Sequence, residues 1–338
     1  MTGQEFFWTA STEEFLRKFP DIRDMLRVCG VGELEPGLPM PQALAAARAE
    51  LARQGLSPDE LVVQISELVD FGPDLAAERR EVNRLTVTGG RDKSGTPENT
   101  ELTIDRGQVV SIVGPTGSGK SQLLADIECL AQGDTPTGRR VLVNGEPLDD
   151  EQRLALEGDL VAQLSQNMNF VLDLSASEFL CMHAESRAIE SSHDVVARCL
   201  DCANDLAGEE FEPATPVTRL SGGQSRALMI ADTAILCASP IVLIDEIENA
   251  GIDRSRAIRL LAGEQKIVLV STHDPILALD ADMRIVIAGG GIRAVIRPDA
   301  QESAALERLE RVDARLKLVR TLVRRGDRIS IDDVGELV

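Results

Sequence analysis

The sequence lacks any segment that could cross a membrane. Apolar residues make up 43% of its 338 residues, but the most apolar stretch, residues 227–244, is broken by Asp232 and Pro240. A spanning helix needs about 20 largely apolar residues in succession. The N-terminal residues MTGQEFFWTASTEEF also lack the basic start and apolar core of a signal peptide. We therefore expect a cytoplasmic protein without direct membrane insertion, which would need a partner to contact a membrane.

Positive charge is also scarce. The formal net charge is −21 at pH 7, and such a surface repels nucleic acids, whose binding depends on neutralising phosphates. We therefore expect no nucleic-acid partner. Lysine is rare beside arginine, and the lysines of the chain are Lys18, Lys93, Lys120, Lys266 and Lys317. One of them, Lys120, lies in the strongest motif of the sequence.

The cysteines do not have the spacing of a closed metal site. Only Cys199 and Cys202 form a C-x-x-C pair, and two ligands do not complete a zinc site. We interpret these thiols as reduced packing residues, with a metal or redox role as the alternative. His183 and His193 are likewise interpreted as surface or packing residues. The full set of cysteines is Cys29, Cys129, Cys181, Cys199, Cys202 and Cys237.

The pattern of elements divides the chain into three parts. Residues 1–78 have the caps and apolar spacing of a small helical domain. Helical and strand segments alternate over residues 82–298, which predicts an α/β sheet with parallel strands. Residues 299–338 hold a C-terminal tail and one amphipathic helix over 305–325, because apolar residues recur there at helical spacing.

A glycine-rich motif follows the predicted strand Val109–Val113 and opens a predicted helix. It matches the pattern G-x-x-x-x-G-K-[ST] with Gly114, Pro115, Thr116, Gly117, Ser118, Gly119, Lys120 and Ser121. Glycines let the backbone curl so that N–H groups converge on phosphates, and the helix adds its positive end. Lys120 would bind the β- and γ-phosphates, and the Ser121 hydroxyl would bind Mg²⁺. The sequence thus predicts a nucleotide-phosphate site.

Two acids stand at the end of a second apolar strand. Residues Ile241–Ile244 are apolar, and Asp245 and Glu246 follow them. A strand-end carboxylate suits the Mg²⁺ shell, so we assign Asp245 to the metal. Glu246 is placed to orient or deprotonate an attacking water. Many strands end in acids, so this motif alone is a weak indication of function. The phosphate loop upstream of it makes the assignment stronger.

The run Leu220-Ser221-Gly222-Gly223-Gln224 resembles the signature of the ATP-binding cassette family. The order of motifs over residues 82–298 is also similar to that family. The resemblance implies a P-loop nucleotide-binding domain with a mixed sheet core and a helical subdomain, which binds ATP and Mg²⁺ and hydrolyses ATP. It further implies a catalytic and Mg²⁺-binding glutamine at Gln166, a switch histidine at His273, and a nucleotide-site aspartate at Asp253.

The signature lies at the start of a predicted helix, so Ser221 and the glycines after it offer a second anion-binding end. In the family this end faces the ATP of a partner. One signature per chain therefore implies a homodimer closed head to tail by two ATP, or pairing with a second cassette chain. Hydrolysis would remove the γ-phosphate contacts and loosen the dimer.

Two features depart from the family pattern. The proline that typically follows the catalytic glutamate is absent, and Glu248 stands in an acidic run. We interpret Glu248 as a solvated residue, with a second functional acid as the alternative. The family stacks adenine on an aromatic upstream of the phosphate loop, yet the sequence has no tyrosine and no Phe or Trp between Phe71 and Phe170. The candidates for that contact are Val87, Arg91 and Lys93.

The N-terminal residues carry a weaker resemblance. Phe15–Pro20, Cys29-Gly30 and the helix from Ser57 resemble a small helical domain found with hybrid-cluster and iron–sulfur repair proteins. The alternative is a helical docking module in which Cys29 only packs.

Three functions fit these features. The first is a soluble cassette ATPase that does conformational work on an unidentified protein partner, such as a metalloenzyme under maturation or activation. The second is the ATP-binding subunit of a membrane transporter, the commonest use of a single cassette. The third, a DNA-repair cassette, is disfavoured by the acidic charge and the lack of a long coiled-coil insert. The extra helices at both ends favour the first function.

Overall fold

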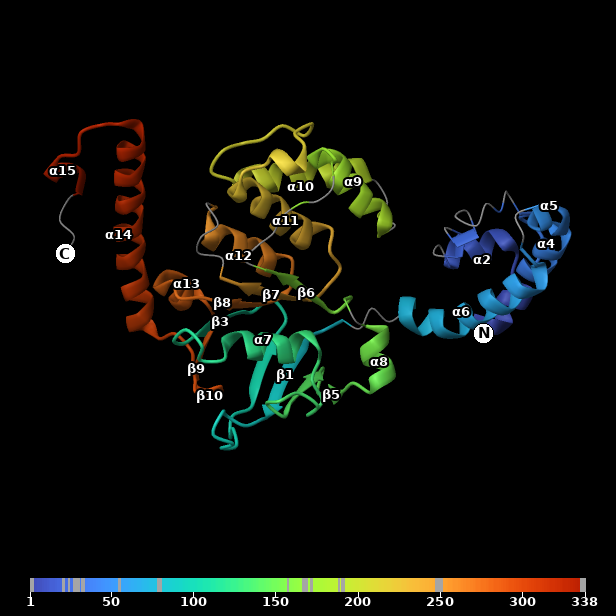
Figure 1. Cartoon of the computed structure of the whole chain (residues 1–338), viewed down its shortest axis with the longest axis horizontal. Helices are drawn as coiled ribbons and strands as arrows, with labels where there is room; N and C mark the ends of the chain where they lie inside the picture. The colour runs from blue at the N-terminus through green and yellow to red at the C-terminus, as the bar shows by residue number, and fades with distance from the viewer. Residues whose placement is uncertain are drawn as a thin grey trace. The chain divides into compact units, whose positions relative to one another are not determined.

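The computed structural model describes residues 3–19, 22–23, 25–26, 31, 34–53, 56–77, 81–156, 158–165, 170, 173–187, 189, 192–246 and 252–334 of the chain (Figure 1). The chain divides into two compact units, Met1–Glu81 and Val82–Val338. Each unit has its own hydrophobic core.

The first unit is built from helices around an aromatic core. Its described helices are α1 (Gly3–Thr9), α2 (Thr12–Lys18), α4 (Met40–Ala46), α5 (Arg48–Arg53) and α6 (Pro58–Ala77). The Ser11 hydroxyl begins α2 by accepting the backbone N–H of Glu14 at 3.3 Å and donating to the Glu14 carboxylate at 3.0 Å. Phe15 and Phe19 lie 4.8 Å apart between ring centroids, and Phe7 packs on Phe15. Cys29 lies outside the described residues.

The second unit is built on a six-stranded sheet with the order β10-β9-β3-β8-β7-β6. The pairs β6–β7, β7–β8, β8–β3 and β3–β9 are parallel, and β9–β10 is antiparallel. Its central strands are buried on both faces, which explains their unbroken apolar runs. The strands are β3 (Val109–Val113), β6 (Val161–Leu164), β7 (Ile241–Asp245), β8 (Ile267–Ser271), β9 (Met283–Ala288) and β10 (Gly291–Ile296).

A second sheet of four strands is antiparallel throughout, with the order β2-β1-β4-β5. The expectation of parallel strands across residues 82–298 is therefore wrong for this sheet. Strand β3 of the other sheet and α7 lie between β2 and β4 in the chain, so the two sheets share one stretch of sequence. The bounds are β1 (Arg84–Gly89), β2 (Leu102–Asp105), β4 (Arg139–Val143) and β5 (Glu146–Pro147). The mixed-sheet α/β fold expected for the cassette family is confirmed.

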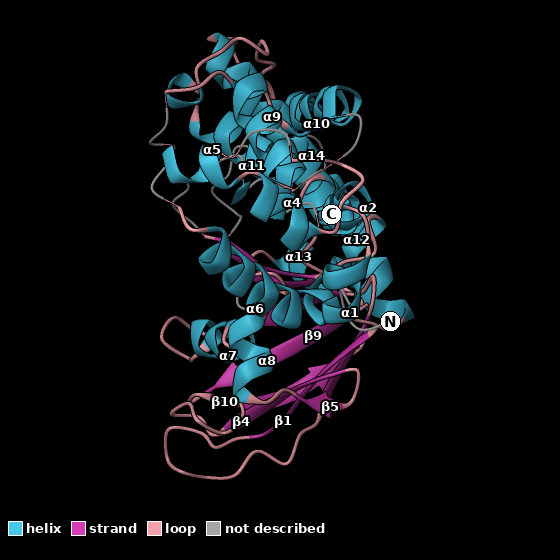
Figure 2. Cartoon of the chain, turned by 90° about the vertical axis from the view of Figure 1, so that its right-hand side faces the viewer, coloured by secondary structure: helices cyan, strands magenta, loops and turns pink. Residues whose placement is uncertain are grey.

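Helices cover both faces of the six-stranded sheet (Figure 2). The helices of the second unit before the C-terminal helix are α7 (Lys120–Glu128), α8 (Asp150–Ala155), α9 (Ala176–Ser186), α10 (Ser192–Leu206), the 3₁₀ turn η1 (Val217–Arg219), α11 (Gly222–Ile235), α12 (Arg254–Gly263) and α13 (Pro275–Asp280). Strand β7 shows the two faces most clearly. Ile241 and Leu243 share a core with Leu123 of α7, whereas Val242 and Ile244 share another with Ala227 of α11. Helices α7 and α11 therefore lie on opposite faces of the sheet.

Helices α9, α10 and α11 form a third core, in which Cys199 is fully buried. Burial, followed by the charge of Asp232, raises the pKa of the Cys199 thiol well above its ordinary value. No group of three metal-ligating side chains occurs among the residues that the structure describes. The structure thus gives Cys199 the environment of a packing residue.

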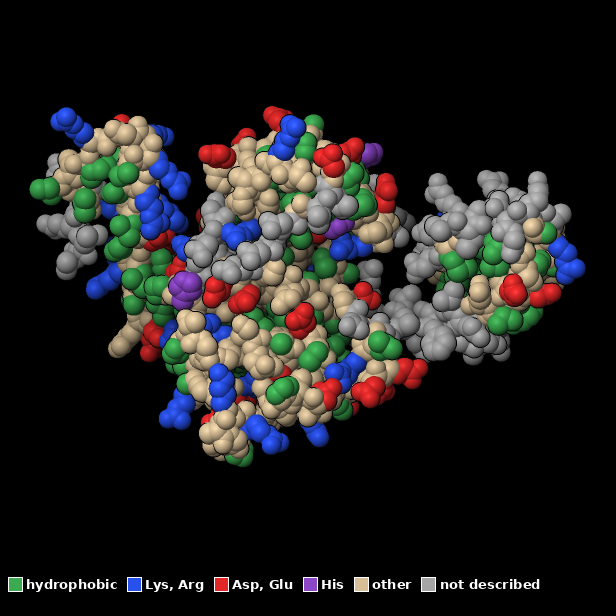
Figure 3. Space-filling view, in the orientation of Figure 1, with side chains coloured by type: hydrophobic (Ala, Val, Ile, Leu, Met, Phe, Trp, Pro, Cys, Tyr) green, Lys and Arg blue, Asp and Glu red, His purple; other side chains and the backbone are tan. Residues whose placement is uncertain are grey.

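The C-terminal helix α14 (Ala300–Arg325) begins five residues before the expected start at residue 305. Asp299 caps it by accepting the N–H groups of Gln301 and Glu302, each at 2.9 Å, and Gly326 ends it with a φ of 80°. No residue of α14 is buried, and apolar and basic side chains share its surface (Figure 3). A short helix α15 (Ile331–Val334) follows. None of the described helices is both long and apolar enough for a membrane span.

Candidate active site

The glycine-rich loop joins β3 to α7, and two of its glycines are required by close packing. Gly114 has a φ of 157°, and a Cβ there would lie 2.3 Å from the Ile287 carbonyl oxygen and 2.7 Å from Ser118 Oγ. Gly119 has a φ of 109°, and its Cβ would lie 2.9 Å from Cα of Gly290. Any side chain at either position would displace backbone, so the motif's glycines set the curl of this loop.

Lys120 opens α7 and folds back over the loop. Its Nζ donates to the carbonyl oxygens of Gly114 at 2.9 Å and Pro115 at 3.4 Å. Ser118 Oγ is buried in the same loop without a hydrogen-bond partner among the described residues, a costly arrangement for a polar atom. Ser121 is exposed on the first turn of α7. Ammonium, hydroxyl and helix-start N–H groups are the donor set that a polyphosphate with Mg²⁺ requires, so these residues fit ATP and its metal.

The acids at the end of β7 lie at the same sheet edge as this loop. Strands β3, β8 and β7 are neighbours and parallel, so their carboxyl ends meet there. Asp245 pairs in register with Ser271, and Glu246 N donates to the Ser271 carbonyl at 3.1 Å. Glu246 has a φ of 51°, which is unusual for a non-glycine residue. Backbone strain of this kind is found preferentially at functional sites.

His273 and Asp253 lie just before two different helices, α13 and α12. His273 is exposed, two residues after β8, and Asp274 beside it caps α13 and pairs with Arg254. Asp253 caps α12 by accepting the N–H of Arg256 at 3.1 Å. Its carboxylate thus has a structural role in the single chain. Gln166 and Glu248 lie outside the described residues.

The signature residues begin α11. Ser221 Oγ accepts the N–H of Gln224 at 3.3 Å, and the Gln224 side chain accepts the Ser221 N–H at 2.9 Å, which completes a capping box. Gly222 has open space around it, and Gly223 is half-buried. Because α7 and α11 pack on opposite faces of the sheet, the structure does not bring the signature to the phosphate loop of its own chain.

The candidates for the adenine contact differ in their surroundings. Val87 is buried in the core of the antiparallel sheet, so the idea that it supports adenine is wrong. Arg91 is exposed, and its backbone N–H donates to the Thr137 carbonyl at 2.8 Å. Lys93 is exposed too, but its Nζ donates to the Gly117 carbonyl of the phosphate loop at 2.9 Å.

Two arginines near the site were missed by the sequence reasoning. Arg226 on α11 lines a small cavity with Asp245 and Glu246. Arg139 is fully buried and forms ion pairs with Glu98 and with Asp126 of α7. Arg226 follows the signature by two positions, which was an available signal. Nothing in the local sequence marks Arg139.

Comparisons with known proteins agree with this geometry. The family model described as ABC transporter matches residues 97–249. An uncharacterized ABC transporter ATP-binding protein of Methanocaldococcus jannaschii is 49% identical over 259 residues, which span 76% of this chain and 99% of that protein. The macrolide export ATP-binding/permease protein MacB of Chromobacterium violaceum is 31% identical over 226 residues, which span 64% of this chain and 34% of that protein.

A solved structure shows the same fold. It is CbiO1 of Clostridium perfringens, described as part of the ABC transporter complex CbiONQ. Its sequence is 22% identical, the TM-score is 0.50, and the match covers 71% of this chain and 98% of that one. None of these relatives supports the iron–sulfur resemblance of the N-terminal residues.

Proposed function

The chain belongs to the ABC transporter family as an ATPase cassette that binds ATP and Mg²⁺, and on that premise we propose that it is the ATP-binding subunit of a membrane transporter. The matched relatives support this reading, since they are named as ATP-binding or permease proteins of transporters. The soluble remodelling ATPase favoured by the sequence has less support, because it rests on the additional helices and on the unusual residues after Glu246.

In the proposed site, residues at the ends of different strands have different roles. The loop from Gly114 to Ser121 holds the triphosphate, with Lys120 neutralising its charge. Ser121, Asp245 and Gln166 would hold Mg²⁺, which would neutralise charge at the phosphates. Glu246 orients or deprotonates water, and His273 contacts the terminal phosphate. These assignments extend the geometry in which β3, β7 and β8 end at one edge.

The observation that carries the proposal is the placement of α7 and α11 on opposite faces of the sheet. A single chain therefore has a phosphate loop and a signature that do not meet. Two chains related by a two-fold axis present each loop to the other's signature. We propose this head-to-tail dimer, formed by two copies or with a second cassette chain, as the hydrolytic form. Ser221, Gly222, Gly223 and Gln224 would complete the partner's site.

Affinity purification of the full chain from its native membranes tests the transporter assignment. The expected result is recovery of an integral membrane protein with the chain, in the presence of a mild detergent. Recovery of soluble proteins only would overturn the assignment and return the remodelling ATPase to first place. The same purification is repeated with the Glu246→Gln variant, which should hold ATP longer. This variant should retain a complex that the native chain loses on washing.

A further inference from the structure

The loop that carries Lys93, upstream of the phosphate loop, contacts the phosphate loop. The backbone N–H of Lys93 donates to the Gly289 carbonyl at 2.8 Å, and Nζ of the same residue donates to the Gly117 carbonyl at 2.9 Å. A Cβ on Gly290 would lie only 2.7 Å from Lys93 Cγ. The lysine stem therefore runs close over the turn Gly289–Gly290, and its ammonium ends on the phosphate loop.

The same turn holds the phosphate loop at a second point. The Gly290 N–H donates to the Ser118 carbonyl at 2.7 Å. The carbonyls of Gly117 and Ser118 are thus both bound by donors from distant segments. In a trans peptide the C=O and the next N–H point in opposite directions. Fixing these two carbonyls therefore fixes the direction of the N–H groups of Ser118 and Gly119.

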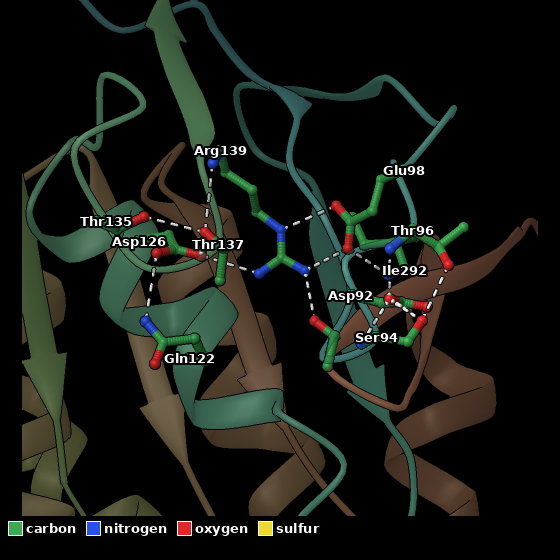
Figure 4. A network of polar contacts seen from close by, with 11 residues as sticks. Asp92, Ser94, Thr96, Glu98, Gln122, Asp126, Thr135, Thr137, Arg139 and Ile292 are labelled. Carbon is green, nitrogen blue, oxygen red and sulfur yellow. Dashed lines mark hydrogen bonds and ion pairs between the residues drawn. The ribbon is translucent and has the colours of Figure 1, made fainter.

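A buried arginine holds together the segments that make these contacts (Figure 4). Arg139 donates to Glu98 at 3.0 and 2.5 Å, to Asp126 of α7 at 2.9 Å, and to the Gly290 carbonyl at 2.9 Å. The Arg139 and Asp126 side chains are 0% exposed and that of Glu98 is 3% exposed. One guanidinium therefore joins the 91–98 loop, the phosphate-loop helix and the turn Gly289–Gly290.

The side chains of this cluster are paired with one another, one guanidinium with two carboxylates. Burial alone would lower the pKa of Arg139, but the hydrogen bonds and charge of Glu98, followed by those of Asp126, outweigh it and raise the pKa. Glu98 also accepts the Ile292 N–H at 2.7 Å, and Asp126 accepts the Thr137 hydroxyl at 2.9 Å. Removing one partner would leave a buried charged group unpaired, which is strongly destabilising, so the contacts of the cluster hold one another in place.

The loop that carries Lys93 is rigid in its own right. The Asp92 carboxylate accepts the Ser94 N–H at 2.8 Å, the Ser94 hydroxyl at 2.6 Å and the Thr96 N–H at 2.9 Å (Figure 4). Glu98 fixes the far end of the loop through Arg139. A flexible lysine thus starts from a backbone held at both ends, which lowers the entropic cost of keeping its ammonium in one place.

We propose that Lys93 is a positioning residue for nucleotide binding, which braces the phosphate loop through the Gly117 carbonyl from a loop that the Arg139 cluster holds in place. The brace raises the fraction of chains whose loop is curled to accept phosphates, and the apparent affinity follows that fraction. The inference rests on the proposed phosphate-binding role of Gly114–Ser121. It gives Lys93 a role at the phosphate loop, whereas the sequence offered it as one of three candidates for the adenine contact.

The test is isothermal titration of the full-length Lys93→Met variant, which keeps an apolar stem and removes the donor. ATP, GTP and inorganic tripolyphosphate should all bind more weakly by the same factor, about three- to tenfold, the range of one net hydrogen bond. Lys93→Arg should restore the affinity, and KM for ATP should rise in Lys93→Met at unchanged kcat. Unchanged affinity would overturn the brace. A loss confined to one nucleotide, with tripolyphosphate unaffected, would also overturn it by showing a base contact.

Two comparisons separate the brace from other effects. Lys317→Met removes the same charge from α14, where Lys317 pairs with Asp313 at 3.0 Å, and should leave all three affinities unchanged. Lys120→Ala tests the phosphate site itself. If Lys120→Ala abolishes binding while Lys93→Met does not weaken it, only the brace is wrong. If Lys120→Ala leaves binding intact, the proposed phosphate site is wrong.

The Arg139 cluster is tested by Glu98→Gln, which preserves shape and removes one buried charge. In variants that melt cooperatively, ATP affinity should fall, and adding Lys93→Met should then cost less than it does in the native chain, because the brace is already displaced. Strictly additive losses would overturn the link between the cluster and Lys93. Should Glu98→Gln fail to fold, Thr137→Val gives the same test through Asp126, whose carboxylate accepts the Thr137 hydroxyl.

Discussion

Lys120 is the residue on which the proposed phosphate binding depends most directly. Its ammonium donates to the loop carbonyls of Gly114 and Pro115. A phosphate would replace these neutral acceptors with charged ones, which form stronger hydrogen bonds. The loop carbonyls thus hold the Lys120 ammonium at the place where a phosphate would bind.

Lys120→Ala should therefore abolish the ATP binding that calorimetry measures at micromolar protein concentration. Lys266→Ala removes the same charge but is a poor control, because Lys266 is buried and donates to the carbonyls of Cys237 and Ser239. Lys317→Ala, on the exposed helix α14, is the better control and should bind ATP normally. Native affinity in Lys120→Ala would refute the assignment of the phosphate loop.

Cys199 illustrates a residue whose environment decides between chemistry and packing. Its raised pKa keeps the thiol protonated at neutral pH, and the thiolate is the reactive form. We predict that iodoacetamide at pH 8 leaves Cys199 unmodified in the native chain and modifies it after unfolding in guanidinium, as measured by peptide mass spectrometry. Exposed Cys129 serves as the internal comparison. Rapid labelling of native Cys199 would contradict its packing role.

At the scale of elements, helix α11 gives Ser221 two roles that can be separated. The hydroxyl caps α11 in the single chain, and the proposed dimer would turn the same helix start toward the partner's ATP. Asp is as good an N-cap as Ser, but its charge would repel a phosphate.

Ser221→Asp should therefore keep the melting temperature and monomer ATP affinity while losing steady-state ATP hydrolysis. Ser221→Ala is the complementary variant, because it loses the cap and should cost about 1 kcal/mol of stability. Phosphate release and thermal melts measure the two effects. Full hydrolysis by Ser221→Asp would show that Ser221 only caps the helix.

At the scale of the whole molecule, the active site is proposed to be complete only in a dimer. Glu246→Gln keeps the size of the side chain but removes the base, so turnover should fall about 10²- to 10⁴-fold while ATP binding persists. With ATP and Mg²⁺ this variant should form a dimer in light scattering. A monomer under those conditions would count against the head-to-tail arrangement.

Mixing inactive chains gives an independent check on the same arrangement. A dimer of one Lys120→Ala chain and one Ser221→Asp chain has one doubly damaged site and one intact site. Equal mixing should therefore recover up to about a quarter of native hydrolysis, since half of the dimers are mixed. No recovery would indicate that each chain uses its own signature.

Several elements could be predicted from neighbouring residues alone. The phosphate loop, the strand Val109–Val113 before it and the helix stop at Gly326 all follow from residues within a few positions of one another. The capping pair Ser221 and Gln224 is equally local. Local φ/ψ preferences and caps act over one turn, so a sequence expresses them directly.

Pairing between distant strands could not be predicted in the same way. The antiparallel sheet joins β1 to β2 and β4. Its strands β1 and β2 alternate apolar and polar residues, unlike the unbroken apolar runs of β7 and β8. Alternation indicates a strand with one buried face, but it does not say which distant strand will be the partner.

The sequence by itself thus determined the family, the phosphate-binding motif and the acids at the strand end, because each is a contiguous pattern with a local physical cause. Only the tertiary structure decided what surrounds them. Lys93 meets Gly117 across 24 positions, and Arg139 meets Glu98 across 41 and Gly290 across 151. Such contacts form because folding closes long loops around a shared core, and no local preference specifies them.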